Sequence, residues 1–185
     1  MGYQFKFTVM GADIDEKQIR REKAEDLVMA LAEAKADAII AKLKENGFEE
    51  ATSEPTLLIM ADQVVLHGGE IREKPSDADE ARQFIKGCYS KGHASTVGSA
   101  MVTNLKTAVR KGDWDKAEVT YNKILQYQLF LPMEEGDVLY VAGGLMVEHP
   151  LTSPFVEVMV GTIDSVMGLS KALTERLIQE AIQEL

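Results

Sequence analysis

The chain has 185 residues, a length that predicts one domain, or one domain with two lobes, and that is sufficient for a sizeable hydrophobic core. Its 30 acidic residues against 20 basic ones give a net charge of −10, which argues against general binding to nucleic acids or to membrane surfaces, and no apolar run is long enough for a membrane span. The single cysteine, Cys88, excludes a disulfide within the chain and favours a reducing compartment, so we expect a cytoplasmic protein.

The first predicted elements are a short strand over residues 5–9 and a long helix over residues 24–45. Residues 13–16 (DIDE) form a polar break between them. The apolar side chains of the helix follow the three-four spacing of one buried face, namely Leu27, Leu31, Ala34, Ala38 and Ala41. The pair Asn46-Gly47 is expected to end this helix.

An apolar run of strand length, residues 57–61, leads directly into Asp62. Residues 64–71 predict a tight hairpin around a Gly-Gly pair. Ser76 is then expected to cap a helix, with Asp79 at the capping-box position. The apolar stripe of that helix comprises Ala81, Phe84, Ile85 and Cys88.

The second half of the chain predicts three further strands and a terminal helix. The strands are placed at residues 93–104, 138–142 and 155–160, and the helix at residues 170–185. Residues 110–115 (RKGDWD) predict a turn, and residues 119–130 fit either a helix or a strand. The alternation of strands and helices indicates an α/β or α+β class with a mixed sheet.

Four charged residues are candidate site residues, and each has a simpler alternative. Asp62, at the end of an apolar run, can bind a divalent cation or accept a proton from water, or it can cap a turn. Lys74, across the hairpin, suits a phosphate group or is an ordinary solvated lysine. Lys35 lies in an alanine-rich stretch and reaches into a cleft or snorkels to solvent. Glu16 lies in an acid cluster that suits a metal or compensates a helix dipole.

Common catalytic motifs do not extend this set of candidates. The three histidines, His67, His93 and His149, show no metal-ligand spacing, and the chain contains no P-loop or GxGxxG fingerprint. Composition and spacing alone therefore stop at an α/β domain in which an acid and a lysine flank one hairpin.

Four segments, in chain order, carry a resemblance to a known family. They are DIDE at 13–16, LAEAKA at 31–36, ADQVVLHGGEIREKP at 61–75, and AGG at 142–144 with VEVMVGTIDSVMG at 156–168. In these segments the chain resembles the Maf family of nucleoside triphosphate pyrophosphatases. The resemblance covers nearly the whole chain and implies a single Maf-like domain over residues 1–185. The implied fold is α/β, similar to that of Maf and inosine triphosphatase, with a mixed sheet flanked by helices and two lobes around a cleft.

The resemblance also implies roles for the candidate residues. Asp62 matches the catalytic acid of the family, which accepts the proton of the attacking water, while Lys35 and Lys74 match its phosphate-facing lysines. Glu16 matches an active-site acid near a divalent metal, Mg²⁺ or Mn²⁺, so Glu16 and Asp62 are the expected metal ligands. The implied reaction cleaves a nucleoside triphosphate between its α- and β-phosphates and releases pyrophosphate. A homodimer is implied by family analogy alone.

Two positions bear on the choice of substrate. Members that prefer dTTP and UTP usually carry Thr after the catalytic aspartate and Gln later in the chain, whereas this chain carries Gln63 and Glu148. That combination resembles the branch that acts on 7-methyl-GTP. A carboxylate at position 148 would also favour a cationic methylated purine over a neutral one. UTP, dTTP and CTP are the other candidate substrates, and the alternative for Glu148 is a side chain that faces solvent.

The chain departs from the family at its beginning. The family has a first strand and a Ser-x-Ser-x-Arg-Arg loop upstream of the segment that matches GYQF here, and this sequence starts inside that pattern. The loop would supply phosphate-binding cations, so its absence predicts weaker binding of a triphosphate to a chain of net charge −10. The alternative function is therefore a nucleotide-binding, catalytically weak truncated isoform with a regulatory role.

Overall fold

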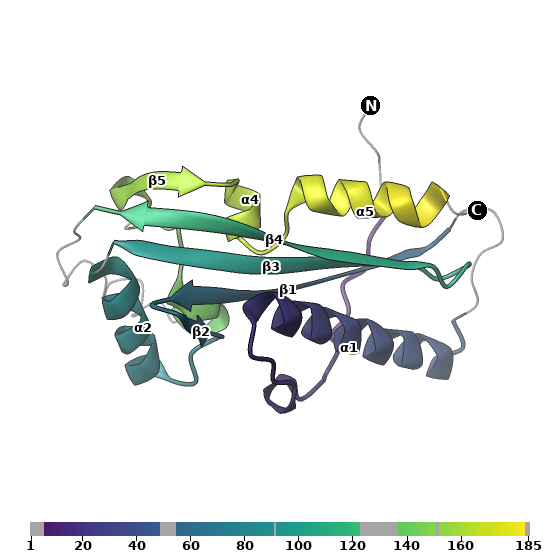
Figure 1. The fold of residues 1–185 in the computed structure, drawn as a ribbon. Coiled ribbons are helices and arrows are strands. Elements are labelled where there is room, and N and C mark those ends of the chain that lie inside the picture. Colours follow the sequence, from purple (N-terminus) through teal and green to yellow (C-terminus); the bar gives the residue numbers. More distant parts are fainter. Residues whose placement is uncertain (1–5, 49–54, 91, 123–136, 151, 184–185) are drawn as a thin grey trace.

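The computed structural model describes residues 6–48, 55–90, 92–122, 137–150 and 152–183. Its centre is a five-stranded sheet in the order β2-β1-β3-β4-β5. The strands are β1 (Leu57–His67), β2 (Glu70–Arg72), β3 (His93–Asn104), β4 (Arg110–Tyr121) and β5 (Val156–Val160). The helices are α1 (Ala24–Glu45), α2 (Ala78–Ser90), α4 (Ile163–Val166) and α5 (Lys171–Gln183), with short 3-10 turns η1 (Glu16–Gln18), η3 (Asp137–Tyr140), η4 (Ala142–Gly144) and η5 (Ser153–Phe155). Figure 1 shows the long strands β1, β3 and β4 with helices above and below them.

The predicted class, α/β with a sheet flanked by helices, is confirmed. The pairing within the described sheet is antiparallel at every ladder, where the sequence predicted a mixed sheet. The reason lies in the path from β2 through α2 to β3. These two strands run in the same direction, but they lie on either side of β1 and so never pair with each other.

Strand alternation divides the central side chains between two faces of the sheet. Helix α1 covers one face, where Leu27 and Leu31 pack with Val64 of β1 and Val97 of β3. Helix α5 covers the opposite face, where Leu173 and Leu177 pack with Ala100 and Val102 of β3. Figure 1 shows α1 below and α5 above the strands. Neighbouring residues of one strand therefore point toward different helices.

A separate hydrophobic cluster lies at the other end of the long strands. It joins Val65 of β1 to Ala81 and Ile85 of α2, to Val166 of α4, and to Val138 of η3. The α5 cluster, which includes Leu57, lies toward the end at which Leu57 pairs with Asn104, whereas the α1 cluster around Val64 and Val97 lies beside Val65 on the opposite face of the sheet. On the face that α5 covers, the apolar contacts are thus divided between the two ends of one continuous sheet.

Three predicted elements differ from the structure. Residues 6–9 of the expected first strand have no regular structure, and Phe7 and Val9 are each 86% exposed, because no described strand pairs with them. The expected turn at 110–115 lies inside β4, since pairing with β3 from Arg110 to Thr120 overrides its glycine and its charges. The expected strand at 138–142 forms η3 and η4, where Gly143 and Gly144 adopt φ of 61° and 62°.

The remaining elements agree with the sequence except in detail. The C-terminal half of α1 buries Ala32, Ala36 and Ile39, whereas Ala34 and Ala38 of the predicted face are half-buried and Ala41 is exposed. Helix α2 is capped by Asp77, whose Oδ1 accepts the N–H groups of Asp79 and Glu80 at 2.9 and 2.8 Å, while the predicted cap, Ser76, donates to the Glu80 carboxylate instead. Of the ambiguous segment 119–130, the part up to Tyr121 belongs to β4, and residues 123–130 lie outside the described residues. No helix among the described residues is both long and apolar enough to cross a membrane.

Candidate active site

Asp62 lies in the middle of β1, opposite Ser99 of β3. The sequence placed it just beyond the end of a strand, but β1 continues to His67 because its ladder with β3 runs without interruption from Leu57 to Leu66. Alternation turns the Asp62 side chain toward α1, where it is only 9% exposed. A carboxylate that is this well shielded from water needs a charged or strongly hydrogen-bonding partner.

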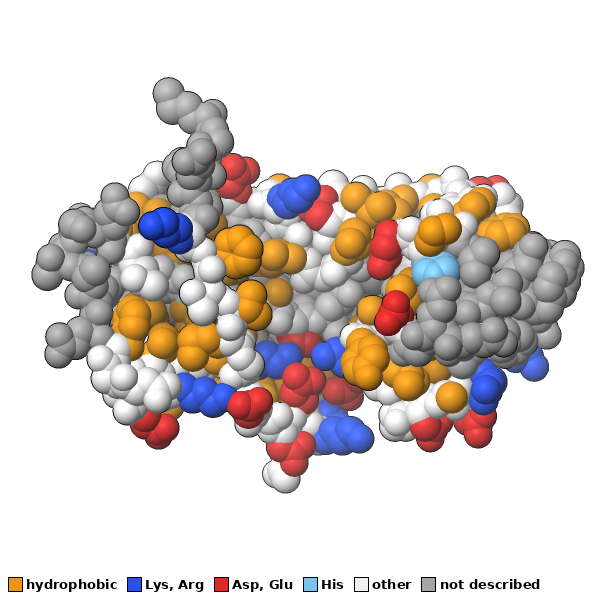
Figure 2. Space-filling model, turned by 180° about the vertical axis from the view of Figure 1, so that it is seen from behind, with side chains coloured by type: hydrophobic (Ala, Val, Ile, Leu, Met, Phe, Trp, Pro, Cys, Tyr) orange, Lys and Arg blue, Asp and Glu red, His pale blue; other side chains and the backbone are white. Residues whose placement is uncertain are grey.

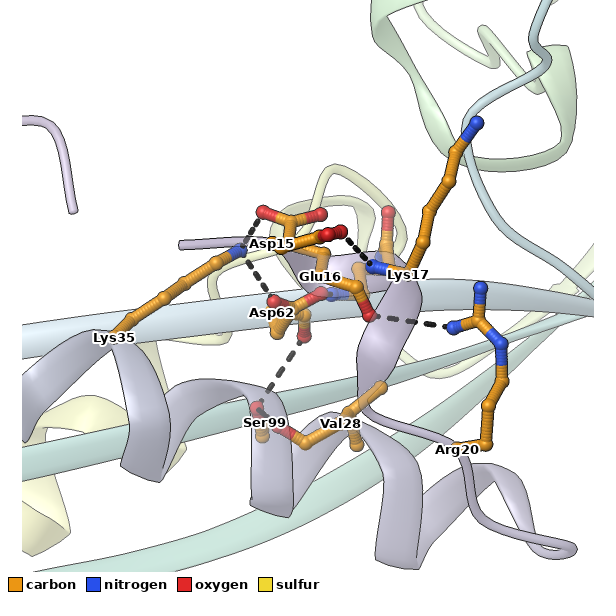
Figure 3. A network of polar contacts seen from close by, with 9 residues as sticks. Asp15, Glu16, Lys17, Arg20, Val28, Lys35, Asp62 and Ser99 are labelled. Carbon is orange, nitrogen blue, oxygen red and sulfur yellow. Dashed lines mark hydrogen bonds and ion pairs between the residues drawn. The ribbon is translucent and has the colours of Figure 1, made fainter. Parts of the chain in front are cut away.

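Lys35 of α1 supplies that partner. Its ammonium nitrogen Nζ lies 2.5 Å from Asp62 Oδ2 and 2.7 Å from Glu16 Oε1, so that one cation joins two carboxylates (Figure 3). The flanking residues Ala32 and Ala36 are fully buried, and these small side chains let α1 lie close to the sheet. Lys35 therefore reaches along the packed surface to two carboxylates, whereas the sequence predicted a reach into a cleft, and its role toward phosphate stays a prediction.

The main chain around Asp62 is held in place by hydrogen bonds from two directions. Asp62 Oδ1 accepts the N–H of Gln63 at 2.8 Å. Ser99 Oγ donates to the carbonyl oxygen of Val28 in α1 at 2.9 Å and lies 3.5 Å from the carbonyl oxygen of Asp62 (Figure 3). Ser99 thereby ties the helix that carries Lys35 to the strands that carry Asp62. The sequence contains no signal for this role, because it depends on the register of β1 with β3.

The second carboxylate, Glu16, belongs to η1. This turn is capped by Asp15, whose carboxylate accepts the Lys17 N–H and the Gln18 side-chain amide, each at 3.2 Å. The acids of the segment 13–16 therefore have different roles. Asp15 caps a turn, and among these acids Glu16 is the one that contacts Lys35. The predicted alternative, an acid that compensates the dipole at a helix N-terminus, therefore applies to Asp15 at the start of η1. It does not apply to α1, which begins only at Ala24.

Burial and the ion pair between Asp62 and Lys35 shift the pKa of each of these two groups in opposite directions. Burial is the largest influence on Asp62 and raises the pKa of its carboxyl group, the Glu16 charge raises it further, and Lys35 and the Gln63 N–H oppose the rise. Burial lowers the pKa of the Lys35 ammonium, but Asp62 and Glu16 together outweigh burial and raise it above 10.5. An ion pair alone would lower the pKa of Asp62, so burial decides the direction. A carboxylate of raised pKa is a stronger base, which suits a proton acceptor.

The structure does not bring the other expected site residues to this pair. Gln63 points to the opposite face of the sheet, where its Nε2 donates to the carbonyl oxygens of Ser165 and Val166 in α4, both at 2.9 Å. Lys74 lies exposed just beyond β2, and Glu148 lies exposed in a turn. Neither forms a hydrogen bond or ion pair with Asp62 within the described part of the chain.

One contact nevertheless links the Lys74 loop to η1. Glu73, which directly precedes Lys74, lies with its carboxylate 3.4 Å from the guanidinium of Arg20. Arg20 also donates to the carbonyl oxygens of Glu16 and Ile19. Glu73 was not singled out from the sequence, and its distance of more than 50 residues from Arg20 along the chain gives no signal for the contact. Arg20 and Glu73 together place the loop that contains Lys74 beside the turn that contains Glu16.

The donor set suits a hard divalent cation. Within the described ranges, no group of three or more histidine, cysteine, aspartate or glutamate side chains forms a metal cluster. Glu16 and Asp62 nevertheless direct their oxygens at one cation, the Lys35 ammonium. Mg²⁺ is commonly held by one or two carboxylates together with substrate phosphates. In the space-filling view, charged side chains of both signs gather in the hollowed middle of one face (Figure 2).

Two acids and a lysine held on an α/β scaffold can bind a divalent cation and offset phosphate charge, which suits a hydrolase that acts on phosphate compounds. The comparison with protein families agrees, because the model of the Maf-like proteins matches residues 1–181. The chain belongs to the Maf family.

Curated relatives match over almost the full chain. A 7-methyl-GTP pyrophosphatase of Dictyostelium discoideum is 34% identical over 183 residues, which cover 99% of this chain and 89% of that protein. A nucleoside triphosphate pyrophosphatase of a Synechococcus species is 31% identical and covers 94% of this chain and 83% of its own length. A dTTP/UTP pyrophosphatase of Desulforamulus reducens is 29% identical, with 89% of this chain and 80% of its own length covered.

Proposed function

We propose that this chain is a nucleoside triphosphate pyrophosphatase that hydrolyses modified nucleoside triphosphates to the nucleoside monophosphate and pyrophosphate. The observation that carries the proposal is the shared contact of Lys35 with Asp62 and Glu16. The names of the relatives support it, since each describes a pyrophosphatase that acts on nucleoside triphosphates.

The residues of the site have separate roles in this reaction. Asp62 accepts a proton from the attacking water, and its raised pKa favours that transfer. Lys35 and Lys74 offset negative charge on the phosphates and on the departing pyrophosphate. Glu16 and Asp62 would hold a divalent cation, Mg²⁺ or Mn²⁺, which supplies further neutralisation of phosphate charge when bound.

We infer that the preferred substrate carries a cationic purine of the 7-methyl-GTP kind. Glu148 is exposed and has its carboxylate available for the guanine N1–H and exocyclic amine. Gln63 is less suited to contact the base directly, because its carboxamide is already bound to α4. Base selection by this chain would therefore rest on Glu148, with UTP, dTTP and CTP as the competing substrates.

The test is pyrophosphate release from 7-methyl-GTP, UTP, dTTP and CTP with Mg²⁺, using the wild type and Asp62→Asn. We expect turnover in the wild type and a loss of about 100-fold or more in the variant, because the proton acceptor is removed. Asp13→Asn is the matched control, since Asp13 pairs with Lys42 outside the site. Full activity of Asp62→Asn would show that Asp62 is not the base.

The alternative is a nucleotide-binding protein that turns over poorly. The observation that favours it is the engagement of both Asp62 oxygens, one by Lys35 and one by the Gln63 N–H, in a side chain that is 9% exposed. It predicts a higher melting temperature with millimolar nucleotide and no pyrophosphate release. Turnover that is lost in Asp62→Asn would exclude it.

A further inference from the structure

Lys35 holds the position that a metal ion would take in the candidate active site. We propose that Lys35 is an internal counter-ion that excludes divalent metal from Glu16 and Asp62 until a nucleotide draws the ammonium away. The inference rests on the proposed function, because it assigns the order in which the substrate and the metal enter that same site. It also gives Lys35 a role before the reaction as well as during it.

The distances exclude simultaneous occupation. Lys35 Nζ lies 2.7 Å from Glu16 Oε1 and 2.5 Å from Asp62 Oδ2. Mg²⁺ coordinates oxygen at about 2.0–2.1 Å, so an ion bound to the same two oxygens would lie almost where the ammonium lies. The repulsion between two cations at such a distance is large in a partly dry site. Metal binding to both carboxylates therefore requires Lys35 to leave.

The burial of the pair makes this displacement costly without a nucleotide. The side chains of Asp62 and Lys35 are 9% and 15% exposed, so water screens their attraction weakly. Lys35 would lose two charge-assisted hydrogen bonds and gain no partner in return. Free metal should therefore bind the empty protein poorly.

A triphosphate changes this balance because it offers the ammonium a new anionic partner. The long side chain of Lys35 can turn toward a phosphate without any movement of α1, and both carboxylates are then available to the metal. Metal and nucleotide affinities are linked reciprocally, so the nucleotide raises metal affinity by the factor by which metal raises nucleotide affinity. We expect the nucleotide to enter first, or together with its own metal.

The test measures Mn²⁺ binding to the metal-free protein in the absence of nucleotide, by electron paramagnetic resonance of the free ion. The proteins are the wild type, Lys35→Met, Lys42→Met and the double variant Glu16→Gln with Lys35→Met. Lys42 is the matched control, because it lies on the same helix and pairs with Asp13 and the Gly11 carbonyl oxygen, away from Asp62. A thermal melt of each variant confirms folding.

We expect Lys35→Met to bind Mn²⁺ about tenfold more tightly than the wild type. Lys42→Met should change the affinity little, and the double variant should lose the gain because one ligand is gone. Equal gains in Lys35→Met and Lys42→Met would reveal only a general effect of net charge and would overturn the proposal.

Pyrophosphate release by the wild type distinguishes failure of the Lys35 proposal from failure of the proposed function. Turnover by the wild type, without tighter Mn²⁺ binding by Lys35→Met, would overturn the role of Lys35 and leave the proposed function intact. The absence of both turnover and Mn²⁺ binding in every protein would overturn both.

Discussion

At the scale of single residues, the site depends on the protonation state of the Asp62 carboxyl group. Asp62 is surrounded by Lys35 from α1, by Glu16 from η1 and by its own neighbouring N–H group. Burial raises the pKa of its carboxyl group, Glu16 raises it as well, and Lys35 lowers it. The two charged neighbours therefore act on Asp62 with opposite signs, and replacing each one separately distinguishes their contributions.

We predict that the Asp62 carboxyl group of the metal-free protein titrates above 3.8, the usual value for aspartate. Glu16→Gln should move its midpoint to lower pH, because a negative neighbour is removed, and Lys35→Met should move it to higher pH, because a stabilising cation is removed. Carbon-13 NMR of the aspartate carboxyl groups measures both shifts. Asp13→Asn should leave the midpoint unchanged, and shifts in the same direction from both site variants would contradict this account.

At the scale of elements, one hydrogen-bonded link joins the strand of Asp62 to the opposite face of the sheet. Gln63 bonds the carbonyl oxygens of Ser165 and Val166, and Ser165 Oγ donates to Asp115 Oδ2 of β4 at 2.7 Å. The short helix α4 is thus anchored to both β1 and β4. Gly168 follows it with φ of 104°, a conformation that favours glycine.

Gln63→Leu tests this anchor. The variant keeps the size of the side chain but withdraws one donor from each of two carbonyl oxygens, so we expect a loss of about 1–3 kcal/mol in the free energy of unfolding. Urea unfolding followed by circular dichroism gives the value. Gln179→Leu, at an exposed position of α5, is the matched control and should cost less than about 0.5 kcal/mol. Equal costs for the two variants would mean that the anchor adds nothing.

The comparison of sequence and structure is also clearest at the scale of elements. The residues 24–45 and 93–104 were predicted with the bounds that α1 and β3 have, because apolar spacing and β-branched content act locally. The strand β4 was missed, since its exposed side chains and Gly112 are tolerated only because β3 pairs with it along its full length. Local preference gives way wherever a neighbouring strand supplies the hydrogen bonds.

The candidate site was likewise predicted in part, because its residues can be read locally but their contacts depend on packing. Asp62, Lys35 and Glu16 were each candidates from the sequence, but a hairpin argument paired Asp62 with Lys74, whereas the observed partner is Lys35, which is 27 residues away. That contact depends on how α1 lies across β1 and on the Ser99 bond to Val28. No pattern within a single segment encodes such packing. The orientation of Gln63 toward the opposite face likewise depends on the continuation of β1 past Asp62.

At the scale of the whole molecule, three long strands run through both hydrophobic ends. Strands β1, β3 and β4 contribute to the cluster of Val65, Ala94 and Val119, and β3 also contributes to the cluster of α5. A strand cannot lose its order at one end without weakening the ladder that continues to the other. We therefore propose that the chain unfolds as one cooperative domain, although its apolar contacts are divided between two ends.

Leu177→Ala tests this cooperativity. Leu177 is 1% exposed and packs on β3, so we expect its truncation to cost about 2–5 kcal/mol in the free energy of unfolding. Trp114, the single tryptophan, lies on β4 and reports by fluorescence, while circular dichroism reports on the helices. We expect both signals to move together to lower urea concentration in one transition, and Leu169→Ala, at a position that is 44% exposed, to cost far less. Two separate transitions in Leu177→Ala would show that the two ends unfold independently, and the chain would then contain two domains.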